Sequence, residues 1–503
     1  ASGTRIIKGG DYLMTHSAAL NYKAIVRILG TILFIIGISM IIPWLYAEFA
    51  KEPESARAFR ICAPITAVFG LLIMVTIKNH TVKFRSREGY LVVALCWLIA
   101  SIAGAFPYYI SGHAGNFLDA IFESTAGFTT TGCTSINAEY TEQSLVLWKA
   151  ISHWLGGMGI LVFVISILPA LGINGQYIAR AESPGPVLEK MTVRMSDSAK
   201  ILYLTYFTFT ALEFILLMLS GKMPVFDAAV NTMGSISTGG LVVHPAGIIH
   251  YDSLYVEIVI SVFCILSSVN FVLYHYLITG KPGYLFKDIE LRVYLCIIAI
   301  AVCICTASLV FVDGLAPGSA LRESFFQVVS MATTTGYVRD TSILWPATCQ
   351  IIMIALLFIG GCSASTAGSI KVVRIIVMMK LIWRGCIKRI HPRSVVAVKL
   401  GDSSMSVSLV TGITTFIFTY LGVFFISAVV LSLQGLDMET TFTTTLAMLS
   451  NTGIAFGETS SIINFSFFHP LLKLYLSALM IIGRLELFTI LILFTRNFWG
   501  RAR

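Results

Sequence analysis

The sequence predicts an all-α polytopic membrane protein: two leading helices, then four parallel repeats of helix, half-length helix and helix around a pseudo-fourfold axis. Three observations predict this fold. The 503 residues are 56% hydrophobic and 12% charged, with a mean hydropathy of +0.83. Apolar runs near twenty residues, each long enough to cross a bilayer as a helix, recur along the whole chain. A short polar turn that ends in Thr-Gly occurs four times, about once every hundred residues.

Composition excludes several other classes of protein. A soluble domain could not keep this much apolar surface from water, and the alternation of polar and apolar residues typical of membrane β-barrels is absent. The formal net charge of +9 is typical of positive residues in cytoplasmic loops, so we expect no nucleic-acid partner. The ten cysteines are scattered through apolar runs without CxxC or metal-ligand spacing, and we interpret them as small core residues.

The chain divides, in order, into a leader, two extra transmembrane helices and four repeats, at 1–24, 25–88, 89–198, 199–286, 287–400 and 401–503. The leader is polar and rich in glycine and has no signal-peptide pattern. We expect full membrane spans, several of them long enough to tilt or break, at 25–46, 58–77, 90–111, 145–171, 200–219, 252–279, 290–312, 348–383, 405–433 and 469–497.

Four shorter apolar stretches, called pore helices below, lie between the full spans at 118–130, 226–237, 322–334 and 439–451. A helix of a dozen residues reaches about 18 Å, roughly half way through a bilayer. Each stretch ends at one of the Thr-Gly turns, whose glycines are Gly132, Gly239, Gly336 and Gly453. An acidic residue precedes each glycine: Asp119, Asp227, Glu323 and Glu439. We favour a first-turn role at the positive end of the helix dipole over a role in gathering cations, although the two are compatible.

Lysine and arginine predict the orientation. Most of the 35 basic residues fall in segments that are cytoplasmic if both termini are cytoplasmic. The four pore helices then enter from outside and the repeats run parallel. A parallel fourfold repeat builds a ring about the membrane normal, whereas inverted repeats would favour a rocking transporter.

The tip of a half-length helix leaves backbone groups unsatisfied, which is tolerated only inside protein or along a watery cavity. Four tips on one axis would stack rings of carbonyl oxygens able to replace the hydration shell of a cation, and glycine provides the backbone freedom that this requires. The alternative is that the glycines are small-residue contacts between helices. We favour that alternative for GGMG at 156–159, but it explains the four turns poorly.

Several motifs carry a resemblance to a known family. These are SREGY (86–90), GGMGI (156–160), AESPGP (181–186), FFQVVSMATTTGY (325–337), GGC (360–362) and GRLELFTILILF (483–494). With the four repeats, they make the chain resemble the membrane subunits of the Trk/Ktr/HKT family of potassium transporters. The resemblance implies a channel-like potassium pore in a homodimer, in a bacterial inner (cytoplasmic) membrane, regulated by a cytosolic TrkA-type nucleotide-binding ring.

By the same resemblance, the turns form a selectivity filter for K⁺. The implied residues are Thr130, Thr131, Gly132 and Cys133; Ser237, Thr238, Gly239 and Gly240; Thr334, Thr335, Gly336 and Tyr337; and Asn451, Thr452, Gly453 and Ile454. Relatives with serine for the first filter glycine tend toward sodium, so the four glycines favour potassium. No turn has the full TVGYG of potassium channels. We therefore expect a shorter, less strict filter that passes rubidium and some sodium.

A run of small and polar residues at 360–370 makes a poor helix interior. Close helix packing is one explanation, but the resemblance favours a break under the filter that forms a mobile gating loop. Its residues are Gly360, Gly361, Cys362, Ser363, Ala364, Ser365, Thr366, Ala367, Gly368 and Ser369. Ala367 and Ser369 stand where relatives commonly have glycine, so we expect a stiffer loop.

Arg484 lies in the apolar run of the last span. A charge at such depth costs about 2.5–3.5 kcal/mol on insertion scales and should face a pore or a partner. Pairing with Glu486 is disfavoured because residues two apart on a helix point in different directions. We therefore predict that Arg484 is a positive barrier beneath the filter.

Two other functions remain as alternatives. A proton- or sodium-coupled potassium symporter could use the same pore. A membrane-embedded enzyme is disfavoured, because the sequence contains no HExxH, GxSxG or Walker loop. His153, Asn270 and His275 are isolated and are interpreted as structural. The chain has no nucleotide site of its own, so a nucleotide would act through a cytosolic partner on basic loops such as 371–399.

Overall fold

The computed structural model describes residues 20–77, 86–136, 141–159, 195–244, 246–338, 345–394, 396–401, 403–457 and 464–499. Helices dominate these residues, which confirms the predicted all-α membrane class. The strands among them are β1 (Lys399–Leu400) and β2 (Ser403–Ser404), which pair antiparallel with Lys399 opposite Ser404. The AESPGP motif at 181–186 lies outside the described residues.

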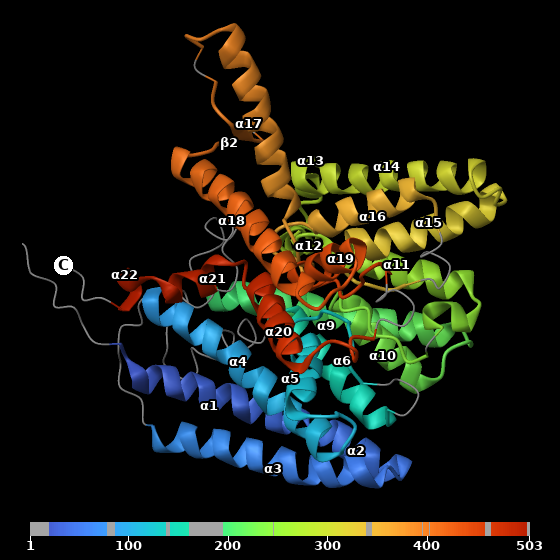
Figure 1. Cartoon of the computed structure of the whole chain (residues 1–503), viewed down its shortest axis with the longest axis vertical. Helices are drawn as coiled ribbons and strands as arrows, with labels where there is room; N and C mark the ends of the chain where they lie inside the picture. Colours follow the sequence, from blue (N-terminus) through green and yellow to red (C-terminus); the bar gives the residue numbers. More distant parts are fainter. Residues whose placement is uncertain are drawn as a thin grey trace, which may run out of the picture.

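The two leading spans form a hairpin along one side of the molecule (Figure 1). The first consists of α1 (Tyr22–Ser39) and α2 (Ile41–Ala50), and the second is α3 (Pro53–Thr76). Glycine permits their close approach: a β-carbon on Gly37 would lie 2.7 Å from the Ala67 Cα, and one on Gly70 would lie 2.9 Å from the Phe34 Cα. Small residues at a helix interface allow this packing in a membrane.

The remaining long helices surround four pore helices. The pore helices are α5 (Phe117–Phe128), α10 (Val225–Ile236), α15 (Pro317–Ala332) and α19 (Met438–Leu449). The surrounding helices are α4 (Ser86–Ile110), α6 (Gln143–Gly157), α9 (Met195–Leu219), α11 (Leu254–Ser268), α14 (Ile289–Phe311), α16 (Ala347–Phe358), α17 (Val372–Ile390), α18 (Val407–Ser432) and α20 (Pro470–Arg484). Shorter helices lie between them or, in the case of the last three, follow α20: η4 (Gly247–Tyr251), α12 (Phe271–Ile278), α13 (Gly283–Lys287), α21 (Phe488–Leu491), η7 (Ile492–Phe494) and α22 (Arg496–Trp499).

Three of the ten predicted spans are broken, and the break within 348–383 falls at the predicted loop, 360–370. Within the described residues, six helices are long and apolar enough to cross a membrane alone. The predicted spans 252–279 and 469–497 bend by 94° and 109°, and 348–383 separates into α16 and α17. The breaks have local causes: Asn270 caps α12 through Val272 N, and Glu486 and Leu487 adopt left-handed φ of 54° and 58°. The predicted span 145–171 is described only as far as Gly159.

The acidic residues near the pore-helix starts follow the prediction in three cases of four. Asp119, Asp227 and Glu439 lie in the first turn. Glu323 does not, because α15 begins earlier, at Pro317, and places Glu323 near its middle. The caps themselves are neighbouring side chains: Asn116 accepts from Asp119 N at 2.9 Å, and Asp437 accepts from Thr440 N at 3.1 Å.

Candidate functional site

Each pore helix ends in a turn with the same backbone. The residue after the C-cap is left-handed in all four, with φ of 55°, 55°, 54° and 57° at Thr130, Thr238, Thr334 and Asn451. Two residues later a glycine is also left-handed, with φ of 63°, 64°, 88° and 78° at Gly132, Gly240, Gly336 and Gly453. Asparagine tolerates this region, but for a β-branched threonine it is an outlier. Such strain persists where the surrounding structure enforces it, as at functional sites.

The second turn corrects the predicted register by one residue. Gly240, and not Gly239, is equivalent to the other three glycines: its N donates to Gly234 O at 3.2 Å, as Gly336 N does to Ser330 O at 3.3 Å. Ser237 is therefore the helix C-cap, and Leu241 takes the place of Cys133. Two adjacent glycines made the register ambiguous in the sequence. Counting from the helix end resolves it.

The four turns meet in a closed ring. A β-carbon on Gly132 would collide with the Gly239 carbonyl, and one on Gly240 with the Thr335 carbonyl. A β-carbon on Gly336 would collide with the Thr452 carbonyl, and one on Gly453 with the Thr131 carbonyl. Each glycine thus abuts the backbone of the next repeat, in the order one, two, three, four, one. The structure therefore brings the predicted turn residues together.

Hydroxyl groups line three of the turns at their inner end. Pairs of hydroxyls lie 2.7 Å apart at Thr129 and Thr131, 2.7 Å apart at Thr333 and Thr335, and 2.8 Å apart at Ser450 and Thr452. The second turn has Gly239 at the equivalent position. A β-carbon there would lie 2.6 Å from His153 Cε1, so the buried imidazole from α6 fills the space of the missing threonine side chain.

Buried charges hold the first turn from behind. Lys149 Nζ lies 2.5 Å from Glu123 Oε1 and donates to the Cys133 carbonyl at 2.7 Å. Glu123 also accepts from Ser135 N at 2.9 Å. Sequence analysis missed this pair. Its only signal was Lys149 at the start of an apolar span.

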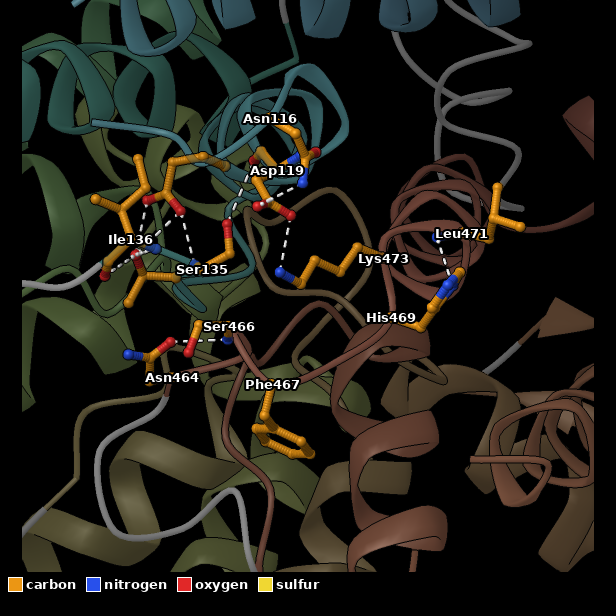
Figure 2. A network of polar contacts seen from close by, with 12 residues as sticks. Asn116, Asp119, Ser135, Ile136, Asn464, Ser466, Phe467, His469, Leu471 and Lys473 are labelled. Atoms are coloured by element: carbon orange, nitrogen blue, oxygen red, sulfur yellow. Dashed lines mark hydrogen bonds and ion pairs between the residues drawn. The ribbon is translucent and has the colours of Figure 1, made fainter. Parts of the chain in front are cut away.

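A second ion pair lies beside the first. Figure 2 shows Lys473 from α20 pointing toward Asp119 at the start of α5, with Ser135 nearby, and Lys473 Nζ is 2.8 Å from Asp119 Oδ1. Ser135 Oγ donates to the Asp119 carbonyl at 3.3 Å. Repeat four is thereby joined to the start of α5, where Ser135, at the outer end of the first Thr-Gly turn, also binds. Asp119 therefore has a partner in the protein.

The third turn is held by neutral groups. The Tyr337 carbonyl accepts from Ser330 Oγ at 2.7 Å and from Gln327 Nε2 at 3.4 Å, and the Tyr337 hydroxyl donates to Asn231 O at 3.1 Å. The carbonyls of Cys133 in the first Thr-Gly turn and Tyr337 in the third thus both accept hydrogen bonds from protein groups.

The predicted loop at 360–370 lies directly beneath the turns. Gly368 N donates to Thr334 Oγ1 at 2.7 Å. The loop begins and ends at one parallel bridge between Ile359 and Ile370, and Cys362 N donates to Ser268 O at 2.9 Å. Two of its non-glycine residues are left-handed, Ala364 with φ 53° and Ser369 with φ 61°. The stiffness expected from Ala367 and Ser369 stays a prediction.

One carboxylate that sequence analysis missed fastens both ends of this loop. Glu290, in the first turn of α14, accepts from Ser363 N at 2.7 Å and from Val373 N at 3.1 Å. The same oxygen accepts from Ser363 Oγ at 3.0 Å. These bonds hold the loop to the start of α14.

Arg484 is the last residue of α20, beside the 109° bend, and not the middle of a continuous span. Its guanidinium donates to Thr366 O at 2.8 Å, and to Gly156 O and Gly157 O at 2.5 Å each. It also reaches Thr130 Oγ1 at 3.5 Å. Glu486 instead forms an ion pair with Arg374, so the disfavoured Arg484–Glu486 pair is absent from the described contacts. The glycines at 156 and 157 both pack and supply carbonyls.

Comparison with known proteins assigns the chain. The profile of the TrkH family, described as cation transport proteins, matches residues 55–501. The chain belongs to the TrkH family. The TrkH family member from Salmonella typhimurium, named Trk system potassium uptake protein TrkH, is 33% identical over 485 residues, covering 95% of this chain and 100% of the relative.

Other TrkH family proteins agree. TrkH from Halomonas elongata is 34% identical over 488 residues, covering 96% of this chain and 100% of that protein. TrkG from Escherichia coli is 32% identical over 487 residues, covering 95% and 98%. The crystal structure of the potassium transporter TrkH from Vibrio parahaemolyticus superposes with a TM-score of 0.85 at 30% identity, covering 96% of this chain and 100% of that one. These relatives are transport proteins, which excludes the enzyme alternative.

Proposed function

We propose that this chain takes up potassium ions across the bacterial cytoplasmic membrane through a channel-like pore. The observation that supports this most is the closed ring of four turns, in which each glycine touches the backbone of the next repeat. Such a ring presents neutral oxygens from four sides of one axis, which suits a weakly hydrated monovalent cation. The C-terminal, negative ends of four pore-helix dipoles face the same point and favour positive charge.

The selectivity filter in this proposal is formed by the turns at 130–133, 238–241, 334–337 and 451–454. The hydroxyls of Thr131, Thr335 and Thr452 add oxygens at the inner end, and the second repeat contributes none there because it has Gly239. The Cys133 and Tyr337 carbonyls already accept protein hydrogen bonds. An outer ring of four free carbonyls is therefore incomplete, which supports a short filter that passes rubidium and some sodium.

The gate in this proposal is the loop at 360–369. It lies under the filter through the Gly368–Thr334 bond and is fastened by Glu290. Arg484 supports the barrier role in two ways: its positive charge lies between the filter and the loop, and it holds the loop through the Thr366 carbonyl. Arg484→Ala should therefore speed potassium flux.

The assembly completes the proposal. We infer a homodimer with both termini cytoplasmic, regulated by a cytosolic TrkA-type nucleotide-binding ring. The excess of lysine and arginine in the predicted cytoplasmic segments supports the orientation. Helix α17, which ends with Lys388 and Arg389 in its last turn, offers a basic surface on the cytoplasmic side for such a ring.

Potassium-dependent growth of an uptake-deficient bacterium tests the proposal. Gly336→Ala should abolish growth at low potassium, because residue 336 has φ +88° and its β-carbon would meet the Thr452 carbonyl. Gly412→Ala, in open space on α18, is the matched control and should grow like wild type. Growth of Gly336→Ala at the wild-type rate would contradict the filter.

A reversal-potential measurement in proteoliposomes separates the channel from the coupled symporter. The reversal potential of a channel does not respond to an imposed proton gradient, and it responds to a sodium gradient only as far as sodium itself permeates. A shift with the proton gradient, or a shift with the sodium gradient as large as that given by an equal potassium gradient, would favour the symporter.

A further inference from the structure

A cluster of three side chains lies away from the turns, on the side of the molecule where the pore helices begin. Glu54 is in the first turn of α3, His113 is in the connection between α4 and α5, and Glu142 is the N-cap of α6. One donor atom from each side chain lies within 4.8 Å of the other two. The leading hairpin and the first repeat thus contribute to the same cluster.

Two helix ends hold this cluster in place by capping each other. The Glu52 carboxylate, at the N-cap of α3, accepts from Gln143 N at 2.9 Å and from Ser144 N at 3.0 Å in α6. In return, the Glu142 carboxylate accepts from Ser55 N at 2.9 Å in α3. The backbone positions of Glu54 and Glu142 are therefore set by hydrogen bonds that do not depend on a ligand. Ligands on rigid elements with such outer support form the more selective sites.

The cluster has unused binding capacity. Among the described residues, neither Glu54 nor Glu142 forms an ion pair, although the two carboxylates approach each other. The Nδ1 atom of His113 is buried and has no hydrogen-bond partner in the described parts of the chain. One nitrogen of the His113 imidazole lies within 4.8 Å of an oxygen of each carboxylate, so a neutral imidazole donor and two anionic donors converge on one point. Glu54 is exposed, which leaves the cluster open to water.

We propose that Glu54, His113 and Glu142 bind a divalent transition-metal ion of the zinc class. Imidazole nitrogen suits zinc, nickel and iron, whereas magnesium and calcium prefer oxygen alone, so the donor set of one nitrogen and two oxygens selects the former group. Three protein ligands leave a coordination position for water. The bound ion would tie the leading hairpin to the first repeat and stabilise the folded protein.

The purified full-length protein in detergent tests this proposal, with Zn²⁺ as the probe and Mg²⁺ as the comparison ion. Calorimetric titration should give one more high-affinity Zn²⁺ ion bound per wild-type chain than per His113→Ala chain. The affinity of this site for Zn²⁺ should be more than about 100-fold lower in His113→Ala, because even changes to residues that only support a ligand cost about 10–100-fold. Zn²⁺, and not Mg²⁺, should raise the thermal midpoint of the wild type. His250→Ala, a histidine outside the cluster, is the matched control and should keep the wild-type response.

Glu54→Gln provides a second variant in case His113→Ala does not fold. Because Glu54 is exposed, this variant should keep the wild-type thermal midpoint in EDTA and lose most of the Zn²⁺ response. A full Zn²⁺ response in both variants, or in Glu54→Gln alone if His113→Ala is unfolded, would overturn the site. Potassium flux in EDTA should equal that of wild type in either folded variant. The metal site and the proposed transport function are therefore tested by separate measurements.

Discussion

The first and third turns have the same sequence, TTTG at 129–132 and at 333–336, and the same left-handed residues, yet the protein holds them by different chemistry. A buried lysine and glutamate fasten the first turn. A serine hydroxyl, a glutamine amide and a tyrosine hydroxyl fasten the third. The strained backbone is therefore the shared requirement, and the group that holds it is interchangeable. The energetic consequences of losing each support differ greatly.

The largest effect should come from breaking the charged support. Lys149→Met leaves the Glu123 carboxylate without its cation. Both side chains are about 95% buried, at 5% and 4% relative exposure, so water cannot replace the lost ammonium group. Removing one partner of a buried ion pair lowers the free energy of unfolding by about 3–5 kcal/mol. Thermal unfolding in detergent should show this loss, while Lys222→Met, at an exposed lysine, should not. The double variant Lys149→Met with Glu123→Leu should recover part of the stability; equal stability of Lys149→Met and Lys222→Met would show that the pair does not support the turn.

The second turn offers the next largest effect, since it lacks the inner hydroxyl. Gly239→Ala places a β-carbon against the His153 imidazole and should cost about 1–3 kcal/mol as overpacking. Potassium uptake and thermal stability should both fall. His153→Ala in the same chain should restore them by making room, whereas Gly422→Ala, in open space, should change neither. Failure of His153→Ala to rescue would mean that the imidazole does not occupy the threonine position.

Removing one neutral support from the third turn should have a smaller effect. Ser330→Ala deletes the hydroxyl that donates to the Tyr337 carbonyl, which keeps its longer bond from Gln327. The expected cost is about 1 kcal/mol, the usual value for one hydrogen bond. Ser432→Ala, whose exposed hydroxyl bonds Val429 O, is the control in the same unfolding measurement. A loss as large as that of Lys149→Met would erase the difference between the two turns.

The smallest effect should come from the loop beneath the third turn. Ala364 is left-handed without a side-chain bond to compensate, which costs about 1–2 kcal/mol for an L-residue. Ala364→Gly should relieve that strain and favour the observed loop, lowering potassium flux in proteoliposomes by about twofold to fivefold, since part of the gain is offset by glycine entropy. Ala347→Gly, at an exposed alanine at the start of α16, is the control. A faster flux in Ala364→Gly would contradict the proposal that this loop, in the conformation described, restricts potassium flux.

The sequence predicted the features that depend on periodicity. Apolar runs and four recurring turns led to the membrane class and to the pore helices, because both repeat along the chain. The register of the second turn was wrong because Gly239 and Gly240 are adjacent, and only the helix end distinguishes them. The position of the bend at 484–488 escaped prediction because left-handed Glu486 and Leu487 are not residues that normally mark a break. The bend at 268–271 was not located because Asn270, which caps α12, was interpreted only as an isolated structural residue.

The supports behind the site were beyond sequence analysis for a different reason. Lys149 pairs with Glu123, and Lys473 with Asp119, across separations of 26 and 354 residues. Nothing in the local pattern shows which carboxylate a given lysine meets. Glu290 was likewise missed, since its partners at 363 and 373 become neighbours only when the loop closes on itself at the Ile359–Ile370 bridge.

Helix α17 projects from the body of the molecule and carries β1 and β2 beside it (Figure 1). Its 19 residues form a rod of about 28 Å. The rod starts one residue after Lys371, whose Nζ donates to the Ala367 carbonyl, and its second residue is fastened to Glu290. A sideways force at the far end of α17 is therefore transmitted to the loop, because α17 is one continuous helix that also contacts α14 and α18. A partner that displaces the far end of α17 would therefore also move the loop at 360–369, which is the gate in the proposed function.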